Sequence, residues 1–517
     1  MLFNSYPFLL IFLPVTLVGF FRIARGGHRL AAMWLAFSSL VFYAWWNPIY
    51  VTLLAASIAF NYMMGVQITR RHSIGTDPKF LLTMSIAVDL AVLGYFKYAN
   101  FFVDVIGTVV SSHYDIGRIV LPLGISFYTF TQIAFLVDAY RGKVRDLNPV
   151  HYTLFVTYFP HLIAGPILHH SEMMPQFRQT SVYRAHAENF AVGLTIFAIG
   201  LFKKTVLADG IAPFAGPLFA TAATTPPSFV DAWGGALAYT CQLYFDFSGY
   251  SDMAIGISRL FGIQLPLNFD SPYKAVNIIE FWRRWHMTLS RFLRDYVYFA
   301  FGGSRHGVPR RYVNLLATML IGGLWHGAGW TFIAWGALHG IYLVINHAWN
   351  AIKQVLAIGQ SSSRSLGARA AHLFTFVAVV CGWVLFRSPD FGTAVSILRA
   401  MLGLTEFALP AAVADHFPAL ALLLGSMGVK FSLGGGSQLL RMVCWLAISL
   451  TIVFIAPNTQ QIMEKYRPGI GTETSREATA AMWQWRPTIG WAIVCAIVGG
   501  CGVLSLHRVS EFLYYQF

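Results

Sequence analysis

Three histidines in apolar, tryptophan-rich stretches are the residues of this chain most suited to chemistry. His286 lies in NIIEFWRRWHMTLSRFLRDYVY (277–298), and His326 and His339 lie in GGLWHGAGWTFIAWGALHG (322–340). A neutral histidine in a dry pocket can take a proton from a hydroxyl group that attacks an acyl donor. The ordinary alternative for each histidine is a structural hydrogen bond between helices. The pattern indicates acyl-transfer chemistry as a hypothesis, with His326 as the first candidate for the base.

Other polar and aromatic residues near these histidines could shape a site. Arg283 and Arg284 could clamp the phosphates of a nucleotide-like donor, or they could form a solvated face towards lipid headgroups. Asp246 interrupts an apolar run, where a carboxylate could orient a histidine or an arginine. Trp325 precedes the second histidine and is either a packing residue or part of the site.

The stretch 277–298, which carries the first histidine, is predicted to form one helix. Apolar residues recur in steps of four and three along one face, and arginines occupy the other face. Asn277 followed by Glu280 is an N-terminal capping signal. Several arginines would be costly in hydrocarbon, so we expect this helix to lie at the membrane surface or to cap a bundle, with its apolar face inward.

The composition is that of a polytopic membrane protein. Hydrophobic residues make up 56% of the 517 residues and charged residues only 11%, whereas a soluble chain carries about a quarter charged residues. The predicted fold class is therefore all-α, with helices packed in lipid. The net charge is +14, and the basic residues cluster between the apolar runs. Such loops face the cytoplasm and favour membrane lipids, so no nucleic-acid partner is implied. The five cysteines lie in apolar stretches, and the sequence contains no metal-binding motif.

The apolar runs predict about eleven to thirteen spans in a single multi-pass domain of residues 1–517. The first basic residue is Arg22, which favours an uncleaved first span with its N-terminus outside. Residues 80–110 are too long for one ordinary span, so part of this run is expected to lie in the membrane plane. Residues 400–427 form a less certain span. Prolines break the apolar segment 159–177, which lipid tolerates only against protein or a water-filled cavity.

Five motifs carry a resemblance to a known family. They stand in this order: PHLIAGPI (160–167), YFDFSGYSDMAIG (244–256), EFWRRWHMTLSRFLRDYVY (280–298), GGLWHGA (322–328) and WGALHG (335–340). Together they resemble the membrane-bound O-acyltransferase (MBOAT) family, closest to its bacterial alginate O-acetylase branch. The core of the resemblance covers residues 159–340, and the similarity extends from residue 1 to at least residue 386.

The resemblance implies an inner-membrane enzyme whose helices surround a central funnel or tunnel. An acyl thioester would enter from the cytoplasm, and the acyl group would leave on the other side. By position, His326 matches the catalytic histidine of the family, and His286 matches the second histidine near the tunnel.

The tail of the chain, residues 507–517, raises a separate hypothesis. Phe512-x-Tyr514-Tyr515 is similar to the Phe-x-Tyr-Phe ending of the small membrane partner in the related D-alanylation system. In that system a tyrosine is proposed to carry the acyl group. Tyr514 would then relay acetyl to a periplasmic partner, and the alternative is an aromatic anchor at the membrane interface.

The predicted function is O-acetylation of an exported, alginate-like polysaccharide. Acetyl-coenzyme A would be the donor substrate, and no bound cofactor or metal is expected. The resemblance implies periplasmic SGNH-hydrolase-like acetyltransferase partners and a location in the bacterial inner membrane. Peptidoglycan and cellulose are alternative acceptors, and D-alanyl transfer is less favoured. Outside the enzymes, the alternatives are a transporter for a polysaccharide or lipid-linked sugar, because broken helices and buried charges suit transporters equally, or a non-catalytic scaffold.

Overall fold

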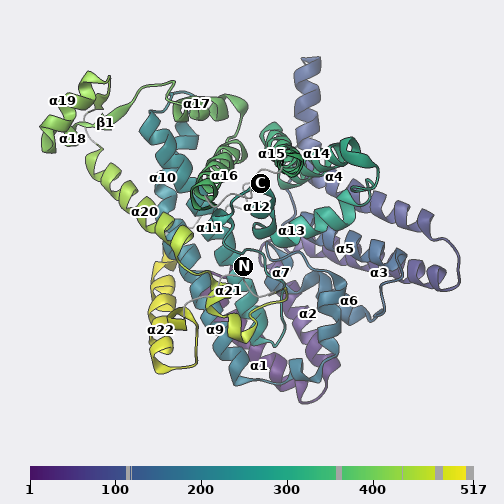
Figure 1. Cartoon of the computed structure of the whole chain (residues 1–517). Helices are drawn as coiled ribbons and strands as arrows, with labels where there is room; N and C mark the ends of the chain where they lie inside the picture. Colours follow the sequence, from purple (N-terminus) through teal and green to yellow (C-terminus); the bar gives the residue numbers. More distant parts are fainter. Residues whose placement is uncertain (112–116, 118, 357–363, 433–434, 472–480, 508–517) are drawn as a thin grey trace.

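The computed structural model describes residues 1–517 apart from 112–116, 118, 357–363, 433–434, 472–480 and 508–517. In this part of the chain the protein is built from α-helices, and its one sheet consists of two three-residue strands (Figure 1). The all-α prediction is confirmed.

The N-terminal third of the chain forms a group of packed helices with an apolar core. Its helices are α1 (Leu13–Ala24), α2 (His28–Ala44), α3 (Ile49–Ser73), α4 (Lys79–Val110), α5 (Ile125–Tyr140) and α6 (Pro149–Thr157). α5 is buried along nearly its whole length, because α3, α4 and α6 pack around it. α4 is one continuous helix of 32 residues. A continuous helix of this length does not determine how its two ends lie relative to the membrane, so the expectation that part of 80–110 lies in the membrane plane stays a prediction.

The segment 159–177 is irregular and buried, as its prolines predict. It contains two single-turn helices, α7 (Phe159–Leu162) and α8 (His170–Met173). Gly165 allows the chain to fold back on itself, because a Cβ at this position would lie 2.3 Å from the Cα of His161. The backbone N–H of Ile167 donates a hydrogen bond to Oγ1 of Thr288 at 3.0 Å. This bond ties the buried loop to the histidine-bearing stretch.

The centre of the chain is a long helix packed on a nearly continuous neighbour. The elements are α9 (Ala187–Phe202), a π-helical turn η4 (Lys203–Ala208), α10 (Asp209–Thr221) and the central α11 (Phe229–Leu260). α11 is buried on almost every face, yet it carries carboxylates. Asp246 pairs with Lys204 at 2.5 Å, and Asp252 pairs with Lys203 at 2.6 Å. These ion pairs allow charged groups to remain inside an apolar bundle.

The stretch 277–298 is broken, so the prediction of one helix is wrong. It consists of α12 (Ile278–Arg284), α13 (Met287–Phe292) and the π-helical turn η6 (Leu293–Tyr298). The break falls at His286, whose φ of +41° lies in the left-handed region. The capping signal is confirmed, because the side chain of Asn277 accepts the backbone N–H of Glu280 at 2.9 Å. The apolar face is buried as predicted, and its periodicity continues across the break, which is why the spacing does not reveal it.

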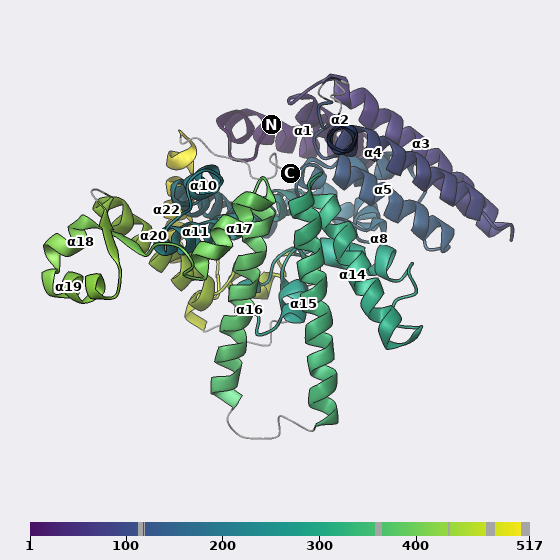
Figure 2. The same ribbon diagram turned by 90° about the horizontal axis from the view of Figure 1, so that it is seen from above.

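The remaining helices include a long hairpin and a projecting arm. The hairpin is α14 (Gly307–His326) and α15 (Trp330–Val355), and α16 (Arg364–Arg387) runs beside α15 (Figure 2). They are followed by α17 (Phe391–Met401), β1 (Ala408–Pro410), α18 (Ala411–His416), α19 (Pro418–Ser426), β2 (Lys430–Ser432), α20 (Gly436–Ile455), α21 (Thr459–Ile462) and α22 (Ile489–Leu504). β1 and β2 pair in parallel, and α18 and α19 project from the bundle (Figure 1). The expected span at 400–427 is therefore wrong, because this run divides into short elements.

Six helices in the described part of the chain are long and apolar enough to cross a membrane, by length and composition. They lie at Ile49–Ser73, Lys79–Val110, Ala187–Thr221, Gly367–Arg387, Gly436–Ile455 and Ile489–His507. The multi-pass prediction is confirmed. The count is below the expected number of about eleven to thirteen, because other apolar runs are short, as α1 is, or contain more polar residues, as α11 does.

Candidate active site

Close packing of α14 against α15 fixes His326, the last residue of α14. A Cβ at Gly323 would lie 2.3 Å from the carbonyl oxygen of Phe332. A Cβ at Gly336 would lie 2.4 Å from the carbonyl oxygen of Met319. The two backbones therefore touch, which only glycine permits. The glycine-rich run around the histidine serves to place the end of α14.

Aromatic rings surround the imidazole of His326. Its ring centroid lies 4.9 Å from that of Trp325. The centroids of Trp335 and Phe386 each lie 5.2 Å away. Within the described residues, neither ring nitrogen of His326 has a hydrogen-bond partner. An imidazole held by apolar contacts in this way is free to bond to a ligand.

The tautomer of His286 follows from its contacts with Asn268. The two histidine ring centroids lie 6.5 Å apart, and Nδ1 of His286 lies 2.9 Å from Oδ1 of Asn268. The same Oδ1 accepts the backbone N–H of Thr288 at 3.4 Å and its hydroxyl at 2.9 Å. A backbone N–H can only donate, so this atom is the amide oxygen, and Nδ1 of His286 carries the proton. The basic nitrogen is then Nε2, which is buried and has no partner among the described residues.

Trp325 adds a hydrogen-bond donor beside both histidines. Its ring centroid lies 6.1 Å from that of His286, and its ring stacks on Phe130 at 5.5 Å. Its indole N–H is buried and unpaired in the part of the chain that the structure describes. Three side chains with unused hydrogen-bonding capacity therefore lie together: His286, Trp325 and His326. Buried polar groups left in this state are typical of a ligand site.

His339 does not belong to this cluster. It is fully buried, and its Nδ1 accepts the indole N–H of Trp282 at 3.3 Å. The ring of Trp335 packs against His339 at 4.9 Å and against His326 at 5.2 Å. His339 therefore contacts Trp335, and Trp335 in turn contacts His326.

Asp246 also points away from the cluster. Its carboxylate lies 2.5 Å from the amine of Lys204, which in turn lies 2.8 Å from the carboxylate of Asp209. The next residue, Phe247, is the one that packs against His286, with ring centroids 4.8 Å apart. The carboxylate therefore links α11 to η4 and α10, and α11 contributes an apolar ring to the cluster.

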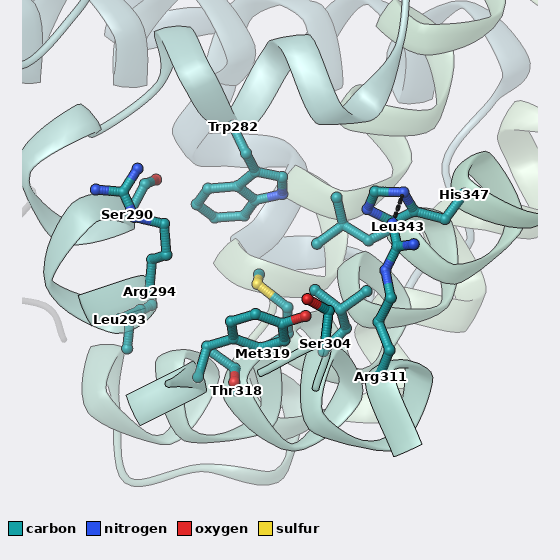
Figure 3. Close-up of a pocket in the computed structure, with 12 residues that line it drawn as sticks. Trp282, Ser290, Leu293, Arg294, Ser304, Arg311, Thr318, Met319, Leu343 and His347 are labelled. Atoms are coloured by element: carbon teal, nitrogen blue, oxygen red, sulfur yellow. Dashed lines mark hydrogen bonds between the residues drawn. The ribbon is translucent and has the colours of Figure 1, made fainter. Parts of the chain in front are cut away.

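A cavity with arginines on its walls lies beside the cluster. It consists of two adjoining hollows of about 380 Å³ and 490 Å³ that share part of their lining, including Trp282 and Arg294. Arg294 and Arg311 approach the first hollow from opposite sides (Figure 3). Arg283 lines the second hollow and is exposed. Arg284 lines neither hollow and instead pairs with Glu280 at 2.7 Å. Of the two arginines expected at a donor site, the structure places one at this cavity.

The inner wall of the cavity reaches the histidine-bearing loop. Met287 and Thr288, which directly follow His286, both line the second hollow. At the rim, the hydrogen bond from Arg294 to Asp295, at 2.7 Å, raises the pKa of Arg294 and keeps its guanidinium charged. The arrangement combines a cationic entrance with an inner wall formed by the two residues that follow His286.

Two residues of this region carry no distinctive sequence signal. Asn268 lies in an irregular connection between apolar residues, and no regular spacing relates it to His286. Lys97 lies within an apolar run, where a lysine is usually expected to extend its amine to the membrane interface.

Tyr514 lies outside the described residues, so its role as an acyl relay stays a prediction. The central funnel and the single-domain organisation also stay predictions.

Comparison with known proteins agrees with this architecture. Residues 79–386 match the MBOAT, membrane-bound O-acyltransferase family. The probable alginate O-acetylase AlgI of Pseudomonas putida is 42% identical over 534 aligned residues, which cover 100% of both chains. The peptidoglycan O-acetyltransferase of Helicobacter pylori is 43% identical over 79% of this chain and 81% of its own length. The teichoic acid D-alanyltransferase of Streptococcus thermophilus is 31% identical over 44% of this chain and 57% of its own.

The match covers α4 to α16 and therefore includes both histidines and every residue that lines the cavity except Ile470 and Gly471. The high identity to O-acetyltransferases extends beyond this region over most or all of the chain. The chain belongs to the membrane-bound O-acyltransferase family and is a multi-pass membrane acyltransferase.

Proposed function

We propose that this protein takes acetyl groups from acetyl-coenzyme A in the cytoplasm and passes them across the bacterial inner membrane for O-acetylation of an exported polysaccharide. The observation that carries the proposal is the pair His286 and His326, enclosed by aromatic rings beside an arginine-walled cavity. The relatives are named as an O-acetyltransferase of peptidoglycan and a probable O-acetylase of alginate, which supports O-acetylation of a polysaccharide. The positive-inside rule directs the basic mouth of the cavity to the cytoplasm.

In the proposed reaction the cavity binds the donor. Arg283, Arg294 and Arg311 would face the phosphates of coenzyme A, for which guanidinium groups are well suited. The apolar lining, with Trp282 and Leu343, suits the pantetheine arm. The thioester would then reach the inner wall of the cavity, next to the break that carries His286.

The histidine cluster would perform the transfer. The oxygen of an acceptor hydroxyl forms a bond to the thioester carbon while His326 takes the hydroxyl proton. The C–S bond breaks, and the departing thiolate receives a proton to become free coenzyme A. The single proton of the hydroxyl goes to His326, so Nε2 of His286, which can only accept, would assist by binding another N–H or O–H group of the bound substrates. The indole N–H of Trp325 would donate to the carbonyl oxygen as its charge grows.

Covalent acetyl transfer separates this proposal from a transporter or a scaffold. Purified protein in lipid nanodiscs is expected to cleave labelled acetyl-coenzyme A at a rate that depends on His326. A protein that leaves the thioester intact, while the modification proceeds in cells, would support the non-enzymatic alternatives.

Loss of the cavity arginines is expected to weaken donor binding without changing the chemical step. The double substitution Arg294→Gln and Arg311→Gln should raise KM for acetyl-coenzyme A by about 100-fold or more, because charge-assisted hydrogen bonds contribute roughly 1.5–3 kcal/mol each and two of them are lost. The matched control is Arg310→Gln, which removes an exposed charge from the neighbouring position of α14 outside the cavity. An equal KM in the double variant and the control would place the donor elsewhere.

On the far side of the membrane, we propose that a periplasmic SGNH-hydrolase-like acetyltransferase delivers the acetyl group to the polymer. Tyr514 would carry the group to that partner. Tyr514→Phe is expected to abolish polymer acetylation in cells and to remove label from the C-terminal peptide, whereas Tyr515→Phe, its matched control, should retain both. Full acetylation with Tyr514→Phe would leave the tail as an interfacial anchor.

Peptidoglycan is the second candidate for the final acceptor. A peptidoglycan O-acetyltransferase and the alginate O-acetylases are similar to this chain to nearly the same degree, at 43% and 42–43% identity. Comparison of acetyl content in isolated cell wall and in secreted polysaccharide, with and without the gene for this protein, distinguishes the two acceptors.

A further inference from the structure

Two consecutive residues of α4 bond to the carbonyl groups at the end of α14. The amine of Lys97 donates to the carbonyl oxygen of Trp325 and, at 3.3 Å, to that of His326. The hydroxyl of Tyr98 donates to the carbonyl oxygen of Leu324 at 2.8 Å. The last three carbonyls of α14 therefore find their partners on another helix, 226 to 229 positions away in sequence.

The residues that follow α14 offer few hydrogen-bond donors to these carbonyl groups. The last carbonyl groups of any helix lack intrahelical partners. The connection to α15 is Gly327-Ala328-Gly329, which has no side chain able to donate. The backbone N–H of Gly327 donates at 3.4 Å to the carbonyl of Gly323, which precedes these three carbonyls in the helix. A lysine at this end of a helix also complements its dipole.

The same amine contacts the side chain of the neighbouring tryptophan. Nζ of Lys97 lies 5.8 Å from the ring centroid of Trp325, within the range of a cation–π contact. A further bond to Oγ of Ser126, at 3.3 Å, links the amine to α5. Polar groups within an apolar helix such as α4 are costly unless they are paired. Lys97 thus joins α4, α5 and the end of α14 at one point.

We propose that Lys97 is a positioning residue for the acyl-transfer site, and that it acts through the last turn of α14. It would hold His326 and Trp325 in line with His286 without touching donor or acceptor. Removing the amine would free the carbonyls at the helix end and let the imidazole drift from its position. This inference rests on the proposed function, because it assumes that His326 takes part in the transfer.

The test compares Lys97→Met, Lys97→Arg and Lys79→Met in nanodiscs, with acetyl-coenzyme A as the substrate. Lys97→Met should lower kcat about 100-fold, the loss expected of a misplaced catalytic group. KM should stay within about twofold of wild type, because the donor cavity is intact. Lys97→Arg keeps a donor at the helix end and should recover most of kcat. Lys79→Met, at the exposed start of α4, should match wild type.

Thermal unfolding measured on the same samples separates positioning from folding. If Lys97→Met fails to fold, Tyr98→Phe removes a single hydrogen bond and should still lower kcat several-fold at constant KM. A Lys97→Met protein with wild-type kcat would overturn the inference, and so would a raised KM at unchanged kcat. If His326→Ala retains full turnover, the proposed function fails, and the positioning role fails with it. If Lys97→Met turns over at the wild-type rate while His326→Ala is inactive, the positioning role is refuted and the proposed function stands.

Discussion

Replacement of His326 with alanine is expected to lower acetyl-transfer turnover by about 1,000-fold, within the range found for loss of a general base. The imidazole has no hydrogen-bond partner in the described part of the chain, so alanine removes the proton acceptor without breaking an internal bond. The measurement is the rate of thioester cleavage per folded molecule in nanodiscs.

His416→Ala is a suitable control for this substitution. His416 is exposed on α18, in the arm that projects from the bundle (Figure 1). Its removal should leave turnover unchanged. Equal turnover in wild type and His326→Ala would contradict the assignment of the base.

Replacement of Asn268 with leucine is expected to lower turnover by about 100-fold, since misassignment of a histidine tautomer is costly in other acyl-transfer enzymes. Leucine has the same branched arrangement of side-chain heavy atoms as asparagine but cannot accept the proton of Nδ1 on His286. The imidazole would lose its fixed tautomer, and Nε2 would no longer be reliably basic. The Thr288 hydroxyl, which also donates to Asn268 and accepts from Ile167, would lose its acceptor at the same time.

Two further variants show whether the effect comes from the acceptor oxygen. Asn268→Asp keeps an oxygen opposite Nδ1 and should recover much of the lost turnover. Ser251→Ala removes only the group that Asn268 bonds through its amide nitrogen, at 3.3 Å, and should change turnover by less than about threefold. If Asn268→Leu is stable and fully active, the tautomer of His286 has no part in the reaction.

The sequence predicts the helical class because hydropathy and the spacing of apolar residues follow directly from burial in lipid. It does not reveal the break at His286, since the apolar stripe from Ile278 to Tyr296 keeps its period while the backbone changes direction. The expected span at 400–427 fails for a related reason, because overall hydrophobicity does not distinguish one long helix from several short elements.

The histidines could be selected because each stands alone in an apolar, aromatic context. Asn268 and Lys97 could not, because their importance lies in contacts between distant segments. Asn268 reaches His286 through a loop, and Lys97 meets the end of α14 from α4. A polar residue in a loop and a lysine in a membrane helix each have common, unremarkable explanations. Only the fold shows that both converge on the histidine pair.

The most direct test of covalent acetyl transfer across the membrane uses sealed proteoliposomes that contain the protein with its periplasmic partner and polysaccharide inside. Labelled acetyl-coenzyme A is added outside to reach the face that carries Arg294 and Arg311. We expect acetyl label on the enclosed polymer, with coenzyme A remaining outside, for wild type and not for His326→Ala. Label that reaches the polymer equally with His326→Ala, or an acetyl-coenzyme A pool that stays intact with wild type, would contradict the account.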